Sequence, residues 1–504
     1  MGRALIGASH KEKGSISAGL PVFKLLKMAF NSFSFWLIFP FIFVSYWAIP
    51  AKWNTWRKVL LLVVSYLLYM NWKPSFALVL LGVTLVTYWG GQILECRDNS
   101  EEIKVRNRKH FVWLFSLIGL LPLLVFKYYN FLNDSISAGL DHIGLQFALP
   151  GLNWAIPVGI SFFTFQAVGY MLDVYHGRLK AEKNLLDYLL FVSFFPQVMS
   201  GPISKANELM PQIKNPHKFD YEQGKQGLKY LLWGMFIKLV IADRLGLFVD
   251  TVYANYIHYS GSTCFIVSIF YTLQIYCDFA GYSLMAIGIA RILGFNLVNN
   301  FKRPYLAVSI TDFWRRWHIS LTRWLTQQVY IPLGGSRCSK ARTYLNIFVT
   351  FLVSGIWHGA NWTFIVWGIM HGIFQIIEKA LGWQKYEGHN WAVKAIRICV
   401  TFLLVNFAWV FFRMPTIGDA WDAISKMFTE FGTPKLSDMG SSILLIIVMG
   451  LTLLIFKDIR DEFFCNKIRF LEAKLVRWTI YIGLFCMVLM FGALDGGSFI
   501  YVSF

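Results

Sequence analysis

The residues best able to do chemistry in this chain are histidines in an apolar setting. Between residues 312 and 372 lie three of the chain's ten histidines: His318, His358 and His371. His358 stands inside a long apolar run, where a neutral imidazole can act as general base toward a hydroxyl within about 3 Å. The alternative is a packed histidine whose ring bonds to a backbone carbonyl. The residues alone leave both interpretations open.

His358 and His371 cannot face one site from an unbroken helix. His371 follows thirteen residues after His358, and an advance of about 100° per residue places the two side chains roughly 220° apart. Gly359 and Asn361 directly after His358 could break the helix. The His358 ring would then lie at a kink.

A helix is predicted to begin near Asp312. Ser309 and Thr311 supply hydroxyl caps, and Asp312 supplies an acid for the first turn. Continued without a break, this helix places its aromatic and leucine residues on one arc: Phe313, Trp314, Trp317, Leu321, Trp324 and Leu325. His318 falls at the edge of that arc. The pattern is typical of a basic helix at, or just inside, a membrane interface.

Basic residues follow a Gly-Gly turn at residues 334 and 335. They are Arg337, Lys340 and Arg342. Backbone N–H groups and fixed cations both suit the phosphates of a nucleotide-bearing donor. Lysine and arginine beside a membrane explain the cluster equally well.

Asp278 lies in the middle of an apolar run at residues 263–293, which is long enough for two elements. A carboxylate inside a membrane costs about 2.5–3.5 kcal/mol on insertion scales, so it usually faces a cavity or a partner. It could instead cap a helix before Gly281 or pair with an arginine such as Arg291. We favour a structural role over a catalytic one.

The composition indicates a membrane protein. The 504 residues are 56% hydrophobic and 15% charged, whereas soluble domains are about 25% charged. The net charge of +19 is explained by cytoplasmic loops that face anionic lipid, although a polyanionic substrate could use it too. We expect membrane lipid and no nucleic acid as partner.

The apolar runs predict an all-α polytopic membrane protein with roughly 11–13 membrane helices, in addition to re-entrant and amphipathic helices. The run at residues 187–200 is short and closes with Pro and Gly, which is typical of a broken or re-entrant helix beside a cavity. Residues 1–27 form a basic, polar leader that we expect to be disordered, ahead of one integral domain at residues 28–504. The charges of the loops do not decide on which side of the membrane the N-terminus lies.

The seven cysteines predict neither a disulfide framework nor a zinc site, because their number is odd and no CxxC spacing occurs. We therefore expect no bound metal and no resident cofactor.

Three stretches resemble motifs of the membrane-bound O-acyltransferase (MBOAT) family, and within it the bacterial branch that O-acetylates alginate. They are residues 278–282 (DFAGY), 313–320 (FWRRWHIS) and 357–362 (WHGANW). Further matches occur at residues 195–197, 201–203, 300–305 and 330–335, and the resemblance covers about residues 28–504. One departure is that Leu325 is followed by Thr326-Gln327-Gln328, where this branch usually has an Arg-Asp pair.

The resemblance implies a helical bundle around a central funnel, with His358 as the catalytic residue and His318 as a second important position. Other residues of these motifs are expected to contact substrate or donor: Arg315, Arg316, Trp317, Asp278, Trp357 and Asn361. No serine or cysteine is placed for a covalent intermediate, so direct transfer is expected.

The resemblance also implies an acetyltransferase of the bacterial inner membrane. Acetyl-CoA would donate the acetyl group, and a periplasmic acetyltransferase partner would pass it to hydroxyls of an exported or cell-surface polysaccharide. Two alternatives stay open: transfer of D-alanine or another acyl group on the same scaffold, and a polytopic transporter that would tolerate loss of His358.

Overall fold

The computed structural model describes residues 30, 32–95, 102–145, 149–385, 388, 390–464 and 473–493, with the side chains of 102–107 and 385 excepted. The predicted leader at residues 1–27 lies outside them, as do Cys96 and Cys465. All regular elements in this described part are helical. The predicted all-α fold is confirmed.

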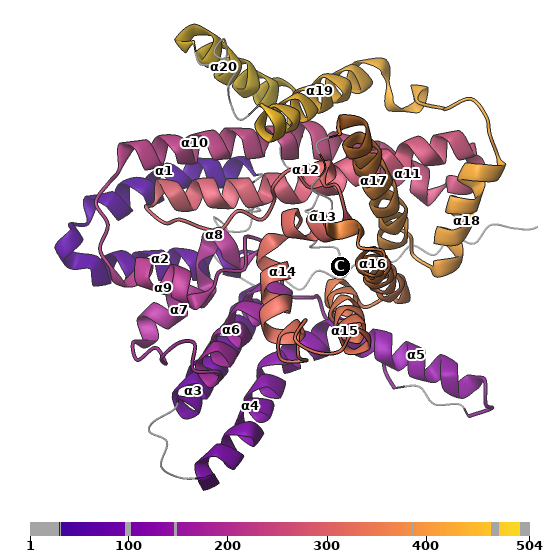
Figure 1. Cartoon of the computed structure of the whole chain (residues 1–504). Helices are drawn as coiled ribbons and strands as arrows, with labels where there is room; N and C mark the ends of the chain where they lie inside the picture. Colours follow the sequence, from indigo (N-terminus) through magenta and orange to yellow (C-terminus); the bar gives the residue numbers. More distant parts are fainter. Residues whose placement is uncertain are drawn as a thin grey trace, which may run out of the picture.

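The helices are labelled as in Figure 1. The first part of the chain forms α1 (Phe33–Ala48), η1 (Ala51–Trp53), α2 (Asn54–Met70), α3 (Pro74–Leu94), α4 (Glu102–Leu123), η2 (Leu124–Tyr128) and α5 (Tyr129–Asp141). The middle forms α6 (Ile160–Tyr175), α7 (Leu185–Ser193), α8 (Phe195–Val198), α9 (Ala206–Lys214), α10 (Tyr221–Met235), η3 (Phe236–Ala242), α11 (Asp243–Ala254), η4 (Tyr256–His258), α12 (Gly261–Ile292) and η5 (Pro304–Leu306).

The last part contains the predicted chemical stretch. It forms α13 (Ile310–Arg316), α14 (Ile319–Leu325), η6 (Thr326–Tyr330), α15 (Lys340–His358), α16 (Trp362–Ala380) and η7 (Trp383–Lys385). It continues with α17 (Trp391–Arg413), α18 (Ile417–Thr429), η8 (Ser437–Met439), α19 (Ser441–Phe463) and α20 (Lys474–Phe491). Figure 1 shows α13 and α14 near the centre, between the band of α10, α11 and α12 and the group of α3, α4 and α6.

Six helical segments in the described residues are long and apolar enough to cross a membrane, or seven if α1 and α2, bent by 103°, form one broken span. This is fewer than the 11–13 membrane helices predicted. Several apolar runs fold into helices too short to span, such as α6 with 16 residues and α7 with 9. The run at residues 187–200 is broken at Phe194 as predicted, and both pieces are buried.

The helix α12 is one continuous element of 32 residues rather than the two elements considered for residues 263–293. It packs closely against α10. A Cβ added to Gly234 would lie 2.7 Å from the carbonyl oxygen of Gly281, and a Cβ added to Gly288 would lie 2.7 Å from the carbonyl oxygen of Gly227. Glycine at these crossings lets the two backbones approach. The helix α12 therefore forms a fixed wall behind the predicted site.

The helices α15 and α16 form a tight hairpin. A Cβ on Gly355 would lie 2.5 Å from the carbonyl oxygen of Phe364, and one on Gly368 would lie 2.6 Å from that of Phe351. The break between the helices follows His358, where Gly359 is extended and Asn361 caps α16 by accepting the N–H of Thr363. The predicted break is confirmed.

Candidate active site

The helix predicted to run on from Asp312 is interrupted, so the continuous-helix prediction is wrong. It ends at Arg316; Trp317 is extended, and His318 adopts a left-handed backbone with φ of 43° before α14 begins. A left-handed residue other than glycine costs about 1–2 kcal/mol.

Asn300 stabilises this break with two hydrogen bonds. Its backbone oxygen accepts the N–H of Ile319 at 3.0 Å, and its side-chain oxygen accepts the N–H of Ser320 at 3.1 Å. These bonds replace the intrahelical partners that an unbroken helix would supply. Asn300 itself is buried, so it holds the left-handed turn from inside the protein.

His318 is fully buried rather than at the edge of an interfacial helix. Its ring lies among three aromatic rings, with centroids 4.7 Å from Phe279, 6.1 Å from Phe162 and 5.9 Å from Trp357. The break explains this position, because a continuous helix would have turned the side chain elsewhere.

The residues around Asp278 form the wall behind His318. Asp278 makes an ion pair with Lys238, whose ammonium also binds Asp243 at 2.6 Å, and all three side chains are buried. Asp278 therefore neither caps a helix nor pairs with Arg291, which hydrogen-bonds Gln226 instead. Ionisable residues inside a membrane usually pair with one another, and this pair accounts for the buried charge of Asp278; the structural role that we favoured stays a prediction.

His358 is the last residue of α15 and is buried. Its Nδ1 lies 2.7 Å from the carbonyl oxygen of Ser354. A carbonyl can only accept, so Nδ1 carries the proton and the neutral ring has its lone pair on Nε2. This is the tautomer that a general base needs. The backbone bond considered as the alternative for His358 is present, and it is compatible with a packed histidine as well as with a general base.

Two tryptophans connect the three histidines. The Trp357 ring lies 5.9 Å from His318 and 4.9 Å from His358, and the Trp367 ring lies 4.8 Å from His358 and 4.9 Å from His371. The Trp314 indole N–H also donates to His371 Nδ1 at 3.3 Å. His318 and His358 are thus both neighbours of the Trp357 indole, whereas His371 is a neighbour of the Trp367 indole.

A pocket opens beside His358. It is lined by Lys127, Ser161, Phe162, Trp357 and His358, with residues 156–160. Lys127 was not singled out in the sequence, although a lone lysine in the apolar run 111–132 was the available signal. Its ammonium donates to the carbonyl oxygens of Trp357 at 2.9 Å and His358 at 2.8 Å.

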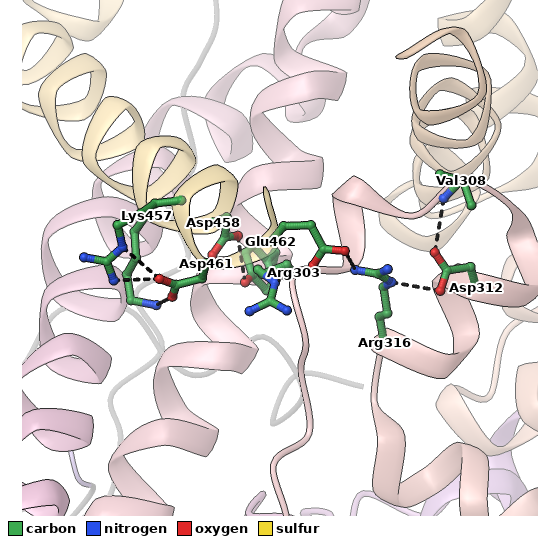
Figure 2. A network of polar contacts seen from close by, with 10 residues as sticks. Arg303, Val308, Asp312, Arg316, Lys457, Asp458, Asp461 and Glu462 are labelled. Atoms are coloured by element: carbon green, nitrogen blue, oxygen red, sulfur yellow. Dashed lines mark hydrogen bonds and ion pairs between the residues drawn. The ribbon is translucent and has the colours of Figure 1, made fainter. Parts of the chain in front are cut away.

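The two arginines before Trp317 have different environments. Arg315 is exposed, whereas Arg316 bonds Asp312 at 2.9 Å and Glu462 of α19 at 3.0 Å (Figure 2). Partial burial alone would lower the pKa of Arg316, but its bonds to these carboxylates outweigh burial and raise it. Arg316 therefore ties the chemical stretch to α19.

Arg303 extends this ion-pair network by binding Glu462 at 2.7 Å (Figure 2). Among the other predicted contacts for substrate or donor, Trp317 is fully buried in the core, and the Trp357 ring neighbours both His318 and His358. Asn361 caps α16 and donates to the carbonyl oxygen of Pro415 at 2.9 Å. Of the predicted set, the structure brings Trp357 next to both histidines, and it places Asn361 and Arg316 in structural contacts.

A second pocket, beside α14, contains the amides that replace the usual Arg-Asp pair. Gln327 and Gln328 each donate to Asp173 at 2.9 Å, and Gln327 also binds Lys205. Ser320 lines the same pocket. These glutamines therefore contact protein side chains close to the His318 turn.

The cationic cluster Arg337, Lys340 and Arg342 is exposed at the start of α15. The described residues contain no group of three or more His, Cys, Asp or Glu that could hold a metal ion.

A family model and several individual proteins match this chain. Residues 177–413 match the membrane-bound O-acyltransferase family (MBOAT). The chain is 37% identical to the probable alginate O-acetylase AlgI of Pseudomonas aeruginosa, covering 84% of this chain and 79% of that protein. It is 34% identical to a peptidoglycan O-acetyltransferase of Helicobacter pylori, with 82% and 81% covered. It is 29% identical to a teichoic acid D-alanyltransferase of Streptococcus thermophilus, with 63% and 78% covered.

Proposed function

This chain belongs to the membrane-bound O-acyltransferase family and is a multi-pass membrane O-acyltransferase, and we propose that it transfers acetyl groups toward hydroxyls of an exported or cell-surface polysaccharide. The donor is a cytoplasmic thioester, acetyl-CoA, and the membrane is the bacterial inner membrane. The names of the relatives at 37% and 34% identity, an alginate O-acetylase and a peptidoglycan O-acetyltransferase, support this class of acceptor.

In this proposal His358 is the general base. Its Nε2 takes the proton of the acceptor hydroxyl while the hydroxyl oxygen attacks the thioester carbonyl carbon. A new ester C–O bond forms, the C–S bond breaks, and the thiolate of the donor leaves with a proton returned from His358. The observation that carries this role is the 2.7 Å bond between Nδ1 and the Ser354 carbonyl, which leaves the basic lone pair on Nε2.

His318 has a supporting role in the proposal. It neighbours the same Trp357 ring as His358, with the centroids of His318 and His358 5.9 Å and 4.9 Å from that indole. We propose that His318 orients the acyl group or stabilises negative charge on the thioester oxygen as it develops.

The acceptor in the first step is a hydroxyl carried by a periplasmic acetyltransferase partner or by the glycan itself. The test uses membrane vesicles that contain the full chain and labelled acetyl-CoA. The vesicles are assayed both with and without an added periplasmic fraction. We expect label in base-labile esters of the glycan. Label that appears only with this fraction supports the partner. Incorporation from a D-alanyl thioester but not from acetyl-CoA would replace the proposed donor, and uptake of label without any ester would favour a transporter.

A further inference from the structure

Lys127 is a cation buried inside a membrane segment. It lies within the apolar helical segment Arg108–Asp141, and its side chain is 8% exposed. Such a lysine is costly in a membrane unless its ammonium finds partners. Here the partners are carbonyl oxygens of the helix that ends in His358, at 2.9 Å for Trp357 and 2.8 Å for His358.

The next residue binds the same helix end. The Tyr128 hydroxyl donates to the carbonyl oxygen of Ile356 at 2.6 Å. The last four carbonyls of any α-helix have no intrahelical partner, and in α15 three of them accept from residues 127 and 128. Ser354, four residues before His358, accepts from the His358 ring itself.

The local sequence explains how two adjacent side chains reach one helix end. Pro122 lies inside α4 and is followed by the π-helical turn η2. Proline removes a backbone hydrogen bond, and single π-helical turns often occur at functional sites. In this turn Lys127 and Tyr128 are both buried and both point at the end of α15.

The positive charge of Lys127 also fits its location at the end of α15. The C-terminal end of a helix carries partial negative charge, which a cation stabilises. A neutral side chain at position 127 would leave the carbonyls of Trp357 and His358 without these donors. The final turn of α15, which sets the direction of the His358 ring, would then have fewer constraints.

We propose that Lys127, assisted by Tyr128, is a positioning residue for His358: it binds the end of α15 and holds the base in its reactive orientation. The proposal rests on the proposed function, in which His358 takes the acceptor proton. Lys127 acts through α15, so its loss reduces the rate of the chemical step more than substrate binding.

The first test does not depend on the donor. Hydrogen–deuterium exchange of the full chain in lipid nanodiscs compares wild type with Lys127→Met and with Lys109→Met, which makes the same change at an exposed position of α4. We expect Lys127→Met alone to speed exchange about 5-fold or more in peptides covering residues 350–362. Equal exchange in all three proteins would overturn the proposal.

The second test separates positioning from simple instability. For properly inserted protein, we expect Lys127→Met to lower kcat about 10- to 100-fold with KM for acetyl-CoA within about 3-fold. Lys127→Arg should recover part of kcat, and Tyr128→Phe should lower it by less. A Lys127→Met protein with wild-type kcat would refute the proposal. If Lys127→Met does not fold, the other two variants test the proposal. Wild-type kcat in Tyr128→Phe combined with no activity in Lys127→Arg would refute the positioning role.

These outcomes differ from failure of the proposed function. If His358→Ala keeps full activity, the base assignment fails whatever Lys127 does. If His358→Ala is inactive and Lys127→Met is fully active, only the positioning role fails.

Discussion

Nδ1 of His358 lies 2.7 Å from the carbonyl oxygen of Ser354, one turn earlier in α15. This bond fixes both the ring direction and the tautomer, because the carbonyl must accept the Nδ1 proton. The residue is at the end of its helix, so its ring can be held by α15 while Nε2 is directed away from the Ser354 carbonyl. Position at a helix end and a bond to the same helix together make His358 suited to proton transfer.

The left-handed turn at His318 should depend on Asn300. In Asn300→Ala the buried N–H of Ser320 loses its acceptor, and an unsatisfied buried group costs about 1–3 kcal/mol. We expect a lower midpoint of thermal unfolding and reduced acyl transfer, measured on purified protein. Asn255→Ala, at an exposed position, should leave both unchanged. Wild-type stability and activity in Asn300→Ala would show that Asn300 does not hold the turn.

The turn after His358 should tolerate only glycine at position 359. A Cβ there would lie 2.1 Å from Cε2 of Phe364, so Gly359→Ala must displace either that ring or the end of α15. We expect activity to fall at least about 10-fold, since misplacement by 1 Å can cost about 100-fold. Gly483→Ala is the control, because nothing lies within 4 Å of its Cβ.

A second variant tests the cause of that loss. Adding Phe364→Ala to Gly359→Ala removes the ring atoms that clash, so the double variant should be more active than Gly359→Ala alone. If the double variant is no better, the ring of Phe364 is not the obstacle.

The buried ion pairs of Lys238 predict an order of stabilities. Lys238→Met leaves two buried carboxylates, Asp243 and Asp278, without their cation, and breaking a buried pair costs about 3–5 kcal/mol. Asp278→Asn keeps the bond between Lys238 and Asp243 and should cost less. Unfolding in increasing denaturant would give this order.

The same variants test whether Asp278 is catalytic. For a structural residue we expect Asp278→Asn to retain transfer activity in proportion to its folded amount. A well-folded Asp278→Asn protein with no activity would contradict the structural role.

The basic residues near Cys338 predict the orientation of the chain. Arg337, Lys340 and Arg342 flank this exposed cysteine, and loops rich in lysine and arginine stay in the cytoplasm. In a variant with Cys338 as its single cysteine, a membrane-impermeant maleimide should label inside-out vesicles and spare right-side-out ones. The reverse pattern would place this loop, and the donor side, outside.

Some of the site follows from local patterns in the sequence. The helical class follows from the long apolar runs, and the break after His358 follows from Gly359 and Asn361. Both are local signals, which a single stretch of sequence contains in full.

Other parts depend on contacts between distant residues. The arc of aromatic residues through Trp317 is regular, so periodicity predicts a continuous helix, whereas the break is stabilised by the bonds that distant Asn300 accepts. Lys238, the ion-pair partner of Asp278, lies forty residues before it in the sequence. Lys127 binds the carbonyl oxygens of residues that follow more than two hundred positions later. No pattern within one element contains these pairings.

The central claim is that His358 takes the proton of the acceptor hydroxyl. The most direct measurement is acetyl transfer from labelled acetyl-CoA to glycan in vesicles, comparing wild type, His358→Ala and His142→Ala, which alters an exposed histidine. At equal amounts of inserted protein, His358→Ala should be slower by about 10²–10⁴, as loss of a general base requires, and His142→Ala should match wild type. Equal incorporation by His358→Ala and wild type would contradict the claim.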